Sequence, residues 1–385
     1  MTQRLYYNDS YLRQFTAQAV ECTADGTTVY LDRTAFYPAS GGQPFDLGSI
    51  AGVAVREVVD EGDRIAHLVT APLAAGPVEC TIDWNRRFDH MQQHTGQHLL
   101  SAVFEELLRL RTVSFHLGAE SSTIDLEGGA LDSRNSAAAE ARANEIVCEN
   151  RPVAVVYEDA GSAQGLRKPS DREGTLRIVS IDRLDRSACG GTHVRATGEI
   201  GTVLIRKLEK VRQTVRVEFL CGGRAIRRAR ADYEALNRVS QMFSASLDEA
   251  PGMVAAQLEA SRAADKVRRK LELDLAAYQG KELYDNTAPG PDGIRRLVHR
   301  ATTGSLEELR ALAQNFTAQS KAVFLASLAN PPSVLLATSA DAGVDAGQAL
   351  KVALAEVGGR GGGTARMAQG SVPEGALLEK VLTKL

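Results

Sequence analysis

The chain has 385 residues, enough for two or three domains, and its hydrophobic and charged fractions of 44% and 24% are those of an ordinary globular protein. Its formal net charge of −3 excludes a uniformly basic nucleic-acid binder, so any contact with nucleic acid must use a local basic surface. The sequence has no recognisable signal peptide and no apolar run of membrane-spanning length, which predicts no membrane association. The five cysteines are scattered and odd in number, which favours a cytoplasmic protein over a disulfide framework.

Residues 1–85 predict a β-barrel-like domain, because short runs of β-forming residues alternate with Gly, Pro and Asp. Within this region lies the segment LDRTAFYPASGGQPFDLG, in which Gly41 and Gly42 permit backbone conformations that other residues avoid. One interpretation is a plain hairpin connection. The other is the rim of a binding site, where the glycines allow close approach and Thr34 and Gln43 supply a hydroxyl and an amide.

The segment DWNRRFDHMQQHTGQHLL predicts an amphipathic helix that continues to about Leu110. Because residues four apart lie on one helix face, His94 and His98 can reach a single atom. Far along the chain, the segment SACGGTH adds Cys189 and His193. Two histidines from a helix, with one cysteine and one histidine from a glycine-rich turn, form a set of zinc-type ligands.

The rest of residues 86–220 predicts an α+β domain built around this zinc site. His90 lies one turn before His94 and is interpreted as a neighbour of the site, since four ligands are available without it. His116, on a predicted strand, is either a contact to the site and its substrate or an ordinary packed histidine.

Residues 221–288 predict a helical connector with a break at Pro251–Gly252. Its apolar residues recur at three- and four-residue steps, which fits a solvated connector with one packing face, an antiparallel helix pair, or a short seam between two copies of the chain. A run of basic residues that includes Arg227 and Arg228 is either a solvated face or a surface for phosphate contact.

Residues 289–385 predict an α/β domain with a glycine-rich loop, GGRGGGTARMAQGS. The loop is neither a Walker loop nor a dinucleotide fingerprint, because it lacks their lysine and their strand–helix context. Arg360, Gly361–Gly363 and Arg366 suit either a flexible loop or one whose amides approach an anionic backbone. Taken together, the sequence predicts an α+β multidomain protein with four parts.

The ligand set leaves two classes of zinc protein open. Four protein ligands favour a closed structural site, whereas catalytic zinc needs an open position. A protease of the H-E-x-x-H type is disfavoured, because HTGQH has no glutamate that could act as the base.

The motifs TAFYPASGGQPFDLG, HTGQH, CGGTH followed by ATGEIG, and GGRGGGTARMAQG resemble, in this order, the editing half of alanyl-tRNA synthetase. The chain is similar over essentially its whole length to the free-standing AlaX editing proteins of the long type, which carry an added C-terminal domain. This resemblance implies a cytoplasmic, ATP-independent hydrolase that acts on mischarged alanine tRNA. Its reaction would be cleavage of the ester that links serine, with glycine as a second candidate, to the tRNA 3′ end.

The resemblance also assigns roles to single residues. It implies Zn²⁺ ligands at His94, His98, Cys189 and His193, a serine-reading hydroxyl at Thr34 and an amide near the reacting ester at Gln43. It further implies that the C-terminal glycine loop contacts tRNA and that this domain can support a homodimer. The alternatives are editing of serine on threonine tRNA and a non-catalytic, zinc-containing tRNA-binding protein.

The chemistry of selection fits the resemblance. An editing site must spare alanine, which differs from serine only by lacking a hydroxyl group. A pocket built to bind that hydroxyl can reject the deoxy analogue by about 10⁴- to 10⁵-fold, because its polar groups would otherwise stay unpaired.

Overall fold

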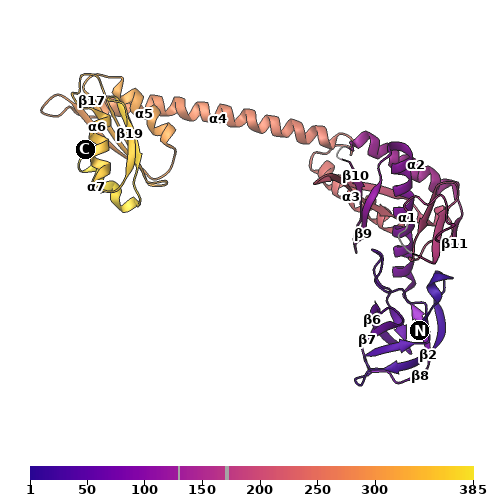
Figure 1. The fold of residues 1–385 in the computed structure, drawn as a ribbon. Helices are drawn as coiled ribbons and strands as arrows, with labels where there is room; N and C mark the ends of the chain where they lie inside the picture. The colour runs from indigo at the N-terminus through magenta and orange to yellow at the C-terminus, as the bar shows by residue number, and fades with distance from the viewer. Residues whose placement is uncertain (129–130, 170–172) are drawn as a thin grey trace. The chain divides into compact units, whose positions relative to one another are not determined.

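The computed structural model describes residues 1–128, 131–169 and 173–385 (Figure 1). By their internal contacts these residues form unit 1, Met1–Arg238, and unit 2, Val239–Leu385. The protein is a multidomain α+β protein, as predicted, whereas the finer division at residues 85, 220 and 288 stays a prediction. In the part of the chain described here, no helix has both the length and the apolarity needed to span a membrane.

Unit 1 begins with a closed six-stranded barrel, which confirms the predicted barrel-like fold. The barrel strands are β2 (Gln14–Cys22), β3 (Thr28–Leu31), β5 (Gly48–Ile50), β6 (Val53–Asp60), β7 (Ile65–Val69) and β8 (Gly76–Ile82). In β8, buried and exposed residues alternate, with Val78, Cys80 and Ile82 inside. Before and between these strands, β1 (Gln3–Arg4) pairs with β4 (Arg33–Thr34), and a short 3-10 helix spans Leu5–Tyr7.

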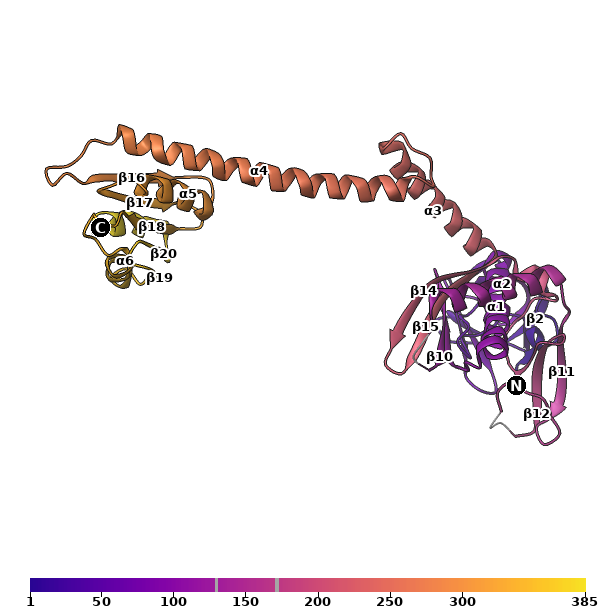
Figure 2. The same ribbon diagram turned by 90° about the horizontal axis from the view of Figure 1, so that it is seen from above.

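The remainder of unit 1 surrounds helix α1 (Trp84–Leu108). The other elements are β9 (Thr112–Leu117), β10 (Ser122–Glu127), α2 (Ser133–Glu149), β11 (Val153–Asp159), β12 (Thr175–Ile181), β13 (Asp185–Ala188), a 3-10 helix (Thr197–Ile200), β14 (Val203–Val211) and β15 (Thr214–Cys221). The strands form one sheet in the order β14-β15-β10-β9 and another in the order β11-β12-β13. Figure 2 shows α1 and α2 between the two groups of strands.

Two helices follow, α3 (Gly222–Met242) and α4 (Ala250–Asn286). The predicted break at Pro251–Gly252 is wrong, because Pro251 lies in the first turn of α4. The missing N–H of a proline costs nothing there, since the first turn has no partner for it. The interruption lies just before this turn, between Met242 and Ala250.

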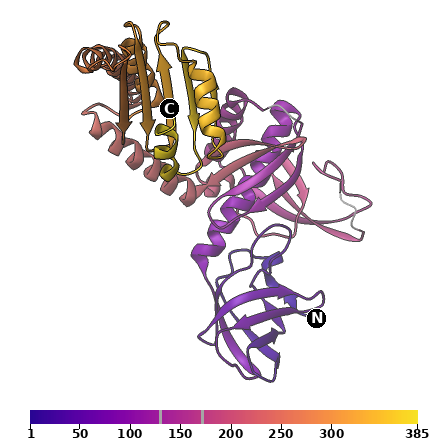
Figure 3. The ribbon, with the colours of Figure 1, turned by 90° about the vertical axis from the view of Figure 1, so that its left-hand side faces the viewer.

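Unit 2 contains a five-stranded mixed sheet in the order β16-β17-β18-β20-β19 (Figure 3). Its elements are β16 (Arg295–Ala301), α5 (Leu306–Thr317), β17 (Ala322–Leu328), β18 (Ser333–Thr338), α6 (Ala346–Ala355), β19 (Arg360–Gly363), β20 (Met367–Ser371), a 3-10 helix (Gly375–Leu377) and α7 (Leu378–Leu382). Strands β17 and β18 are buried on both faces, since α4 and α5 contribute to one apolar cluster and α6 and α7 to the other.

The glycine-rich segment differs from the predicted loop. Arg360–Gly363 forms the edge strand β19 and pairs with β20, while Arg366 lies in the turn between them. Added Cβ atoms at Gly361 and Gly363 would lie 2.5 and 2.2 Å from backbone oxygen atoms of β20. The glycines are therefore needed for the close pairing of β19 with β20. A glycine run has no alternation of polar and apolar side chains, so the sequence did not predict this strand.

Candidate metal centre and its cavity

Helix α1 positions two histidines at the centre of unit 1. The side chain of Asp83 caps its first turn by accepting from the backbone N–H of Arg86. The helix ends at Leu108, and the capping residue that follows, Arg109, has a left-handed φ of 57°. His94 and His98 lie four residues apart on this helix, and both are buried. Their shared face is the one predicted from their spacing.

The turn that follows β13 carries the other two candidate ligands, Cys189 and His193. Close contact with α1 is possible because Gly191 has no side chain. A Cβ atom at this position would lie 2.2 Å from Cε1 of His94. The glycine therefore lets the turn approach the histidine ring directly.

The four predicted ligands converge. One donor atom from each of His94, His98, Cys189 and His193 lies within 4.8 Å of the other three. Cys189 Sγ is 3.5 Å from His94 Nε2 and 3.3 Å from His193 Nε2. Ligands at ordinary Zn–N and Zn–S distances in a tetrahedron lie about 3.5 Å apart, so this donor set fits a zinc ion.

Each imidazole of the set is held through its other ring nitrogen. His94 Nδ1 hydrogen-bonds Gln43 Oε1 at 2.8 Å, His98 Nδ1 hydrogen-bonds Asp185 Oδ2 at 2.8 Å, and His193 Nδ1 hydrogen-bonds Thr95 Oγ1 at 3.1 Å. Carboxylate and amide oxygens in these positions keep the proton on Nδ1 and leave Nε2 free for a metal ion. The arrangement is that of an oriented metal site.

The electrostatics of the cluster follow from burial and close packing. Burial raises the pKa of the Cys189 thiol, but the imidazoles of His94 and His193 outweigh it and hold this pKa well below its ordinary value. Burial lowers the pKa of His193 to about 3, which keeps this ring neutral at pH 7. For His98, burial lowers the pKa, but the hydrogen bond that its Nδ1–H donates to Asp185 outweighs burial and raises the pKa to about 9, so a metal ion must displace a proton here.

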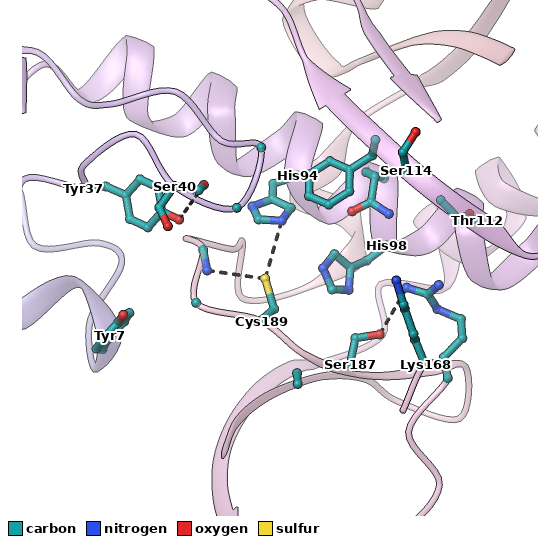
Figure 4. Close-up of a pocket in the computed structure, with 18 of the residues that line it drawn as sticks. Tyr7, Tyr37, Ser40, His94, His98, Thr112, Ser114, Lys168, Ser187 and Cys189 are labelled. Carbon is teal, nitrogen blue, oxygen red and sulfur yellow. Dashed lines mark hydrogen bonds between the residues drawn. The ribbon is translucent and has the colours of Figure 1, made fainter. Parts of the chain in front are cut away.

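A cavity of about 580 Å³ opens beside the cluster (Figure 4). His94, His98 and Cys189 line it, together with Gly41 and Gly42 of the glycine loop. The four-residue set is therefore not sealed in the core, since one side of it faces a space large enough for a small-molecule ligand.

Comparisons with known proteins bear on what this centre serves. The family model described as "Threonyl and Alanyl tRNA synthetase second additional domain" matches residues 176–218, and the DHHA1 domain matches residues 297–385. The alanyl-tRNA editing protein AlaX-L of Pyrococcus horikoshii is 31% identical over 97% of this chain and 95% of its own length. This chain belongs to the alanyl-tRNA editing protein family.

Two further relatives show how the similarity extends. The alanyl-tRNA editing protein Aarsd1 of Mus musculus is 29% identical over 83% of this chain and 82% of its own length. The alanine–tRNA ligase of Korarchaeum cryptofilum is 31% identical over 98% of this chain but only 44% of its own length. The match to the editing protein family thus runs through both units of the chain.

The predicted loop residues of this family member occupy different positions around the cavity. Gly41 and Gly42 line it, with positive φ values of 53° and 82°. Gln43 is buried behind the ligands, where its amide oxygen contacts His94 and its amide nitrogen donates to Thr192 Oγ1 at 2.8 Å. The sequence predicted this amide at the rim of a binding site, whereas in the structure it contacts a candidate ligand directly.

Thr34 does not lie among the residues that line this cavity. It is fully buried, with its Oγ1 2.8 Å from His67 Nε2 and accepting from the backbone N–H of Phe36 at 3.1 Å. His67 Nδ1 in turn donates to the Val29 carbonyl. The hydroxyl group is thus engaged inside the barrel.

His116 also lies apart from the cavity, on the exposed side of β9, while the preceding residue, Phe115, lines it. The ring centroids of Phe115 and His94 are 5.6 Å apart. Thr112, Val113 and Ser114 line the cavity as well, so the lining part of β9 ends at Phe115, one residue before the exposed His116. Sequence reasoning missed Phe115, because an apolar residue beside a histidine gives no signal of its own.

The predicted tRNA contacts are all on the surface. Arg227 and Arg228 are exposed on α3, and Arg228 pairs with Asp232. Arg360, Gly361, Gly362, Gly363 and Arg366 are exposed on β19 and the turn after it. Other members of the basic run are neutralised, since Arg216 pairs with Asp125 and Arg224 with Asp89.

Proposed function

We propose that the protein is a zinc-dependent hydrolase that removes serine, and also glycine, from mischarged alanine tRNA. The observation that carries this proposal is the convergence of four donor side chains, three of which line a cavity, in a chain of the alanyl-tRNA editing family. The five free cysteines fit a reducing compartment, so we place the reaction in the cytoplasm.

In this proposal the chain orients the metal ligands and the substrate, and the metal ion supplies the positive charge that activates the ester or the water. Zn²⁺ held by these residues would polarise an ester carbonyl or lower the pKa of a water molecule when one of the four ligands is displaced or a fifth coordination position opens. Gln43, Asp185 and Thr95 hold the three imidazole rings. Gly41, Gly42 and Gly191 allow the acyl group to approach the backbone near the cluster.

We propose that Thr34 affects substrate selection through the loop that it anchors. Its hydroxyl group holds the turn at Phe36, and the chain then continues to Gly41 and Gly42 at the cavity. For tRNA itself, we propose phosphate contacts at Arg227, Arg228, Arg360 and Arg366, with the Gly361–Gly363 backbone alongside, because these residues offer exposed cations and accessible amides.

Side-by-side deacylation assays test the proposal. The substrates are alanine tRNA charged with serine, glycine or alanine, and threonine tRNA charged with serine. We expect release of serine and glycine from alanine tRNA, sparing of alanine, and loss of activity after treatment with a chelator. The Cys189→Ala variant should lose both metal and activity, whereas Cys148→Ala, an exposed cysteine outside the cluster, should keep both.

The results separate the proposed function from its alternatives. Hydrolysis of serine on threonine tRNA alone would favour the threonine-type activity. Full zinc content without hydrolysis of any of the four substrates would identify a structural zinc protein.

We also propose that two copies of the chain associate through α4. Val267, Leu271, Leu275 and Tyr278 form a stripe on this helix, and each has 57–76% of its surface exposed. On the opposite face, Ala276 and Gly280 are buried, and an added Cβ at Gly280 would lie 2.4 Å from the Leu312 carbonyl of α5. The stripe is thus left uncovered by the helix's own unit, as a seam between copies requires.

Light scattering after size-exclusion chromatography tests this association. We expect a dimer for the native chain and a monomer for Leu271→Glu. The control Ala255→Glu adds the same charge to an exposed position on the other side of the helix and should stay dimeric. A native chain that is monomeric at micromolar concentration would rule the dimer out.

A further inference from the structure

The cavity beside the metal cluster has a second, aromatic end. Figure 4 shows Tyr7 and Tyr37 on one side of Cys189, with Ser187 and Lys168 on the other. All five residues line the same cavity. The space is therefore continuous from the ligand set to the tyrosines.

The size of the cavity exceeds what the acyl group needs. A cavity of about 580 Å³ falls within the range that holds a drug-sized ligand. A seryl or glycyl group at the metal end would leave most of it empty. The proposed substrate carries a larger group next to the ester, namely the terminal adenosine of the tRNA.

Four glycines also line the cavity. Gly41 and Gly42 lie on one segment and Gly190 and Gly191 on another, and all four line the cavity. A Cβ at Gly191 would meet His94, and one at Gly190 would lie 3.7 Å from Tyr7. The backbone of one short turn therefore lies next to both His94 and the Tyr7 ring, and these two positions add no side chain to the cavity.

The Tyr7 ring is held in place while remaining partly exposed. It packs edge-on against Tyr6 with ring centroids 4.8 Å apart, and its hydroxyl accepts from Arg4 Nη1 at 3.4 Å. Arg177 Nε donates to its backbone carbonyl at 3.1 Å, and the same arginine donates from Nη1 to the Cys189 carbonyl at 2.6 Å. Arg177 thus ties the position of Tyr7 to that of the metal-binding turn.

We propose that Tyr7 is the stacking platform of a subsite for a purine nucleotide, occupied in the reaction by the terminal adenosine of the charged tRNA. An aromatic ring fixed by its neighbours and open to a cavity binds a base by stacking, with little ordering cost. The inference rests on the proposed function for the identity of the nucleotide. It does not rest on that function for the binding itself, so the two can fail separately.

Calorimetric titration of the full chain with adenosine 5′-monophosphate tests the subsite directly. Because stacking on one aromatic ring contributes about 1–3 kcal/mol per base, Tyr7→Leu should weaken binding about 5- to 150-fold. Tyr7→Phe keeps the ring and should bind as the native chain does. In deacylation of Ser-tRNA, Tyr7→Leu should raise KM and leave kcat nearly unchanged.

A matched control separates stacking from the general loss of a tyrosine. Tyr233 is exposed on α3, lies near the Arg230 guanidinium and does not line the cavity, so Tyr233→Leu should not change binding. Should Tyr7→Leu fail to fold, as judged by circular dichroism, Tyr7→Trp replaces it and should bind the nucleotide more tightly than the native chain.

Equal affinity of the native chain and Tyr7→Leu would overturn the inference, as would equal loss of affinity in Tyr7→Phe and Tyr7→Leu. Nucleotide binding that depends on Tyr7 in a chain without deacylase activity would keep the subsite and remove the proposed function. If Tyr7→Leu changes neither the KM of deacylation nor the affinity for the nucleotide, the proposed function stands and the subsite at Tyr7 does not.

Discussion

Asp185 lies between a metal-facing imidazole and a guanidinium. Its Oδ2 accepts from His98 Nδ1 at 2.8 Å, and its Oδ1 accepts from Arg167 Nε at 2.7 Å. The carboxylate is buried, and the two hydrogen bonds hold both of its oxygens, so its orientation is fixed. It therefore fixes the ring of His98 so that Nε2 faces the cluster.

Removing this negative charge should weaken metal binding. We expect Asp185→Asn to bind zinc about 10- to 100-fold more weakly, because partners behind a ligand typically contribute that much to affinity. Competition with a chromophoric chelator measures the change. Asp182→Asn, an exposed position nearby, serves as the control. Equal affinity in the two variants would show that Asp185 does not orient the ligand.

We expect His67 to make the barrel sensitive to acid. Burial lowers its pKa to about 4, while its two ring nitrogens contact Thr34 and the Val29 carbonyl. Below pH 6.5, the ordinary pKa of histidine, His67 takes up a proton in the unfolded chain but stays neutral in the folded chain until the pH approaches 4. The folded state should therefore lose stability as the pH falls from 6.5 through 4, by at most about 3 kcal/mol.

Urea unfolding followed by the fluorescence of Trp84, the single tryptophan, measures this loss at pH 7, 5.5 and 4. In His67→Gln the decline between pH 6.5 and 4 should be smaller than in the native chain. His299→Gln, in unit 2, should retain the native decline. A decline of the same size in His67→Gln would assign the acid sensitivity to other groups.

At the scale of elements, the turn after β13 leaves no room for a side chain beside His94. Gly191 and Gly190 are adjacent, yet an added Cβ would lie 2.2 Å from His94 at the first and 3.7 Å from Tyr7 at the second. We expect Gly191→Ala to displace the His94 ring and to lose most bound zinc, and Gly190→Ala to retain it. Metal analysis of both purified variants checks this, and full zinc in Gly191→Ala would show that the turn can move away.

Helix α1 could be predicted with its ligands, because His94 and His98 follow the helical repeat and the apolar residues share that period. Strand β13 was not predicted, since Asp185–Ala188 alternates burial without alternating hydrophobicity. The contacts of Gln43 and Asp185 join residues 51 and 87 positions apart. Such pairings depend on tertiary packing, and no local pattern encodes them.

At the scale of the whole molecule, the four ligands belong to one unit. The cluster lies within Met1–Arg238, whereas the DHHA1 match lies within Val239–Leu385. An ion that binds only the folded form stabilises what it binds. Metal binding should therefore act on the stability of one unit alone.

Scanning calorimetry with and without a chelator checks this expectation. Chelation should lower the melting temperature of the transition reported by Trp84 and leave the other transition in place. Cys189→Ala should show the lower temperature whether or not the chelator is present. A common shift of both transitions would mean that the two units unfold together.

The candidate ligands His94 and Cys189 are 95 residues apart in sequence, so a metal ion shared by them would close a long loop of chain. Under the proposed reaction, a cell short of zinc would lose this proofreading step and part of the stability of unit 1 at the same time. Incorporation of serine or glycine at alanine codons would then increase when zinc is scarce, so the accuracy of translation would depend on the zinc supply.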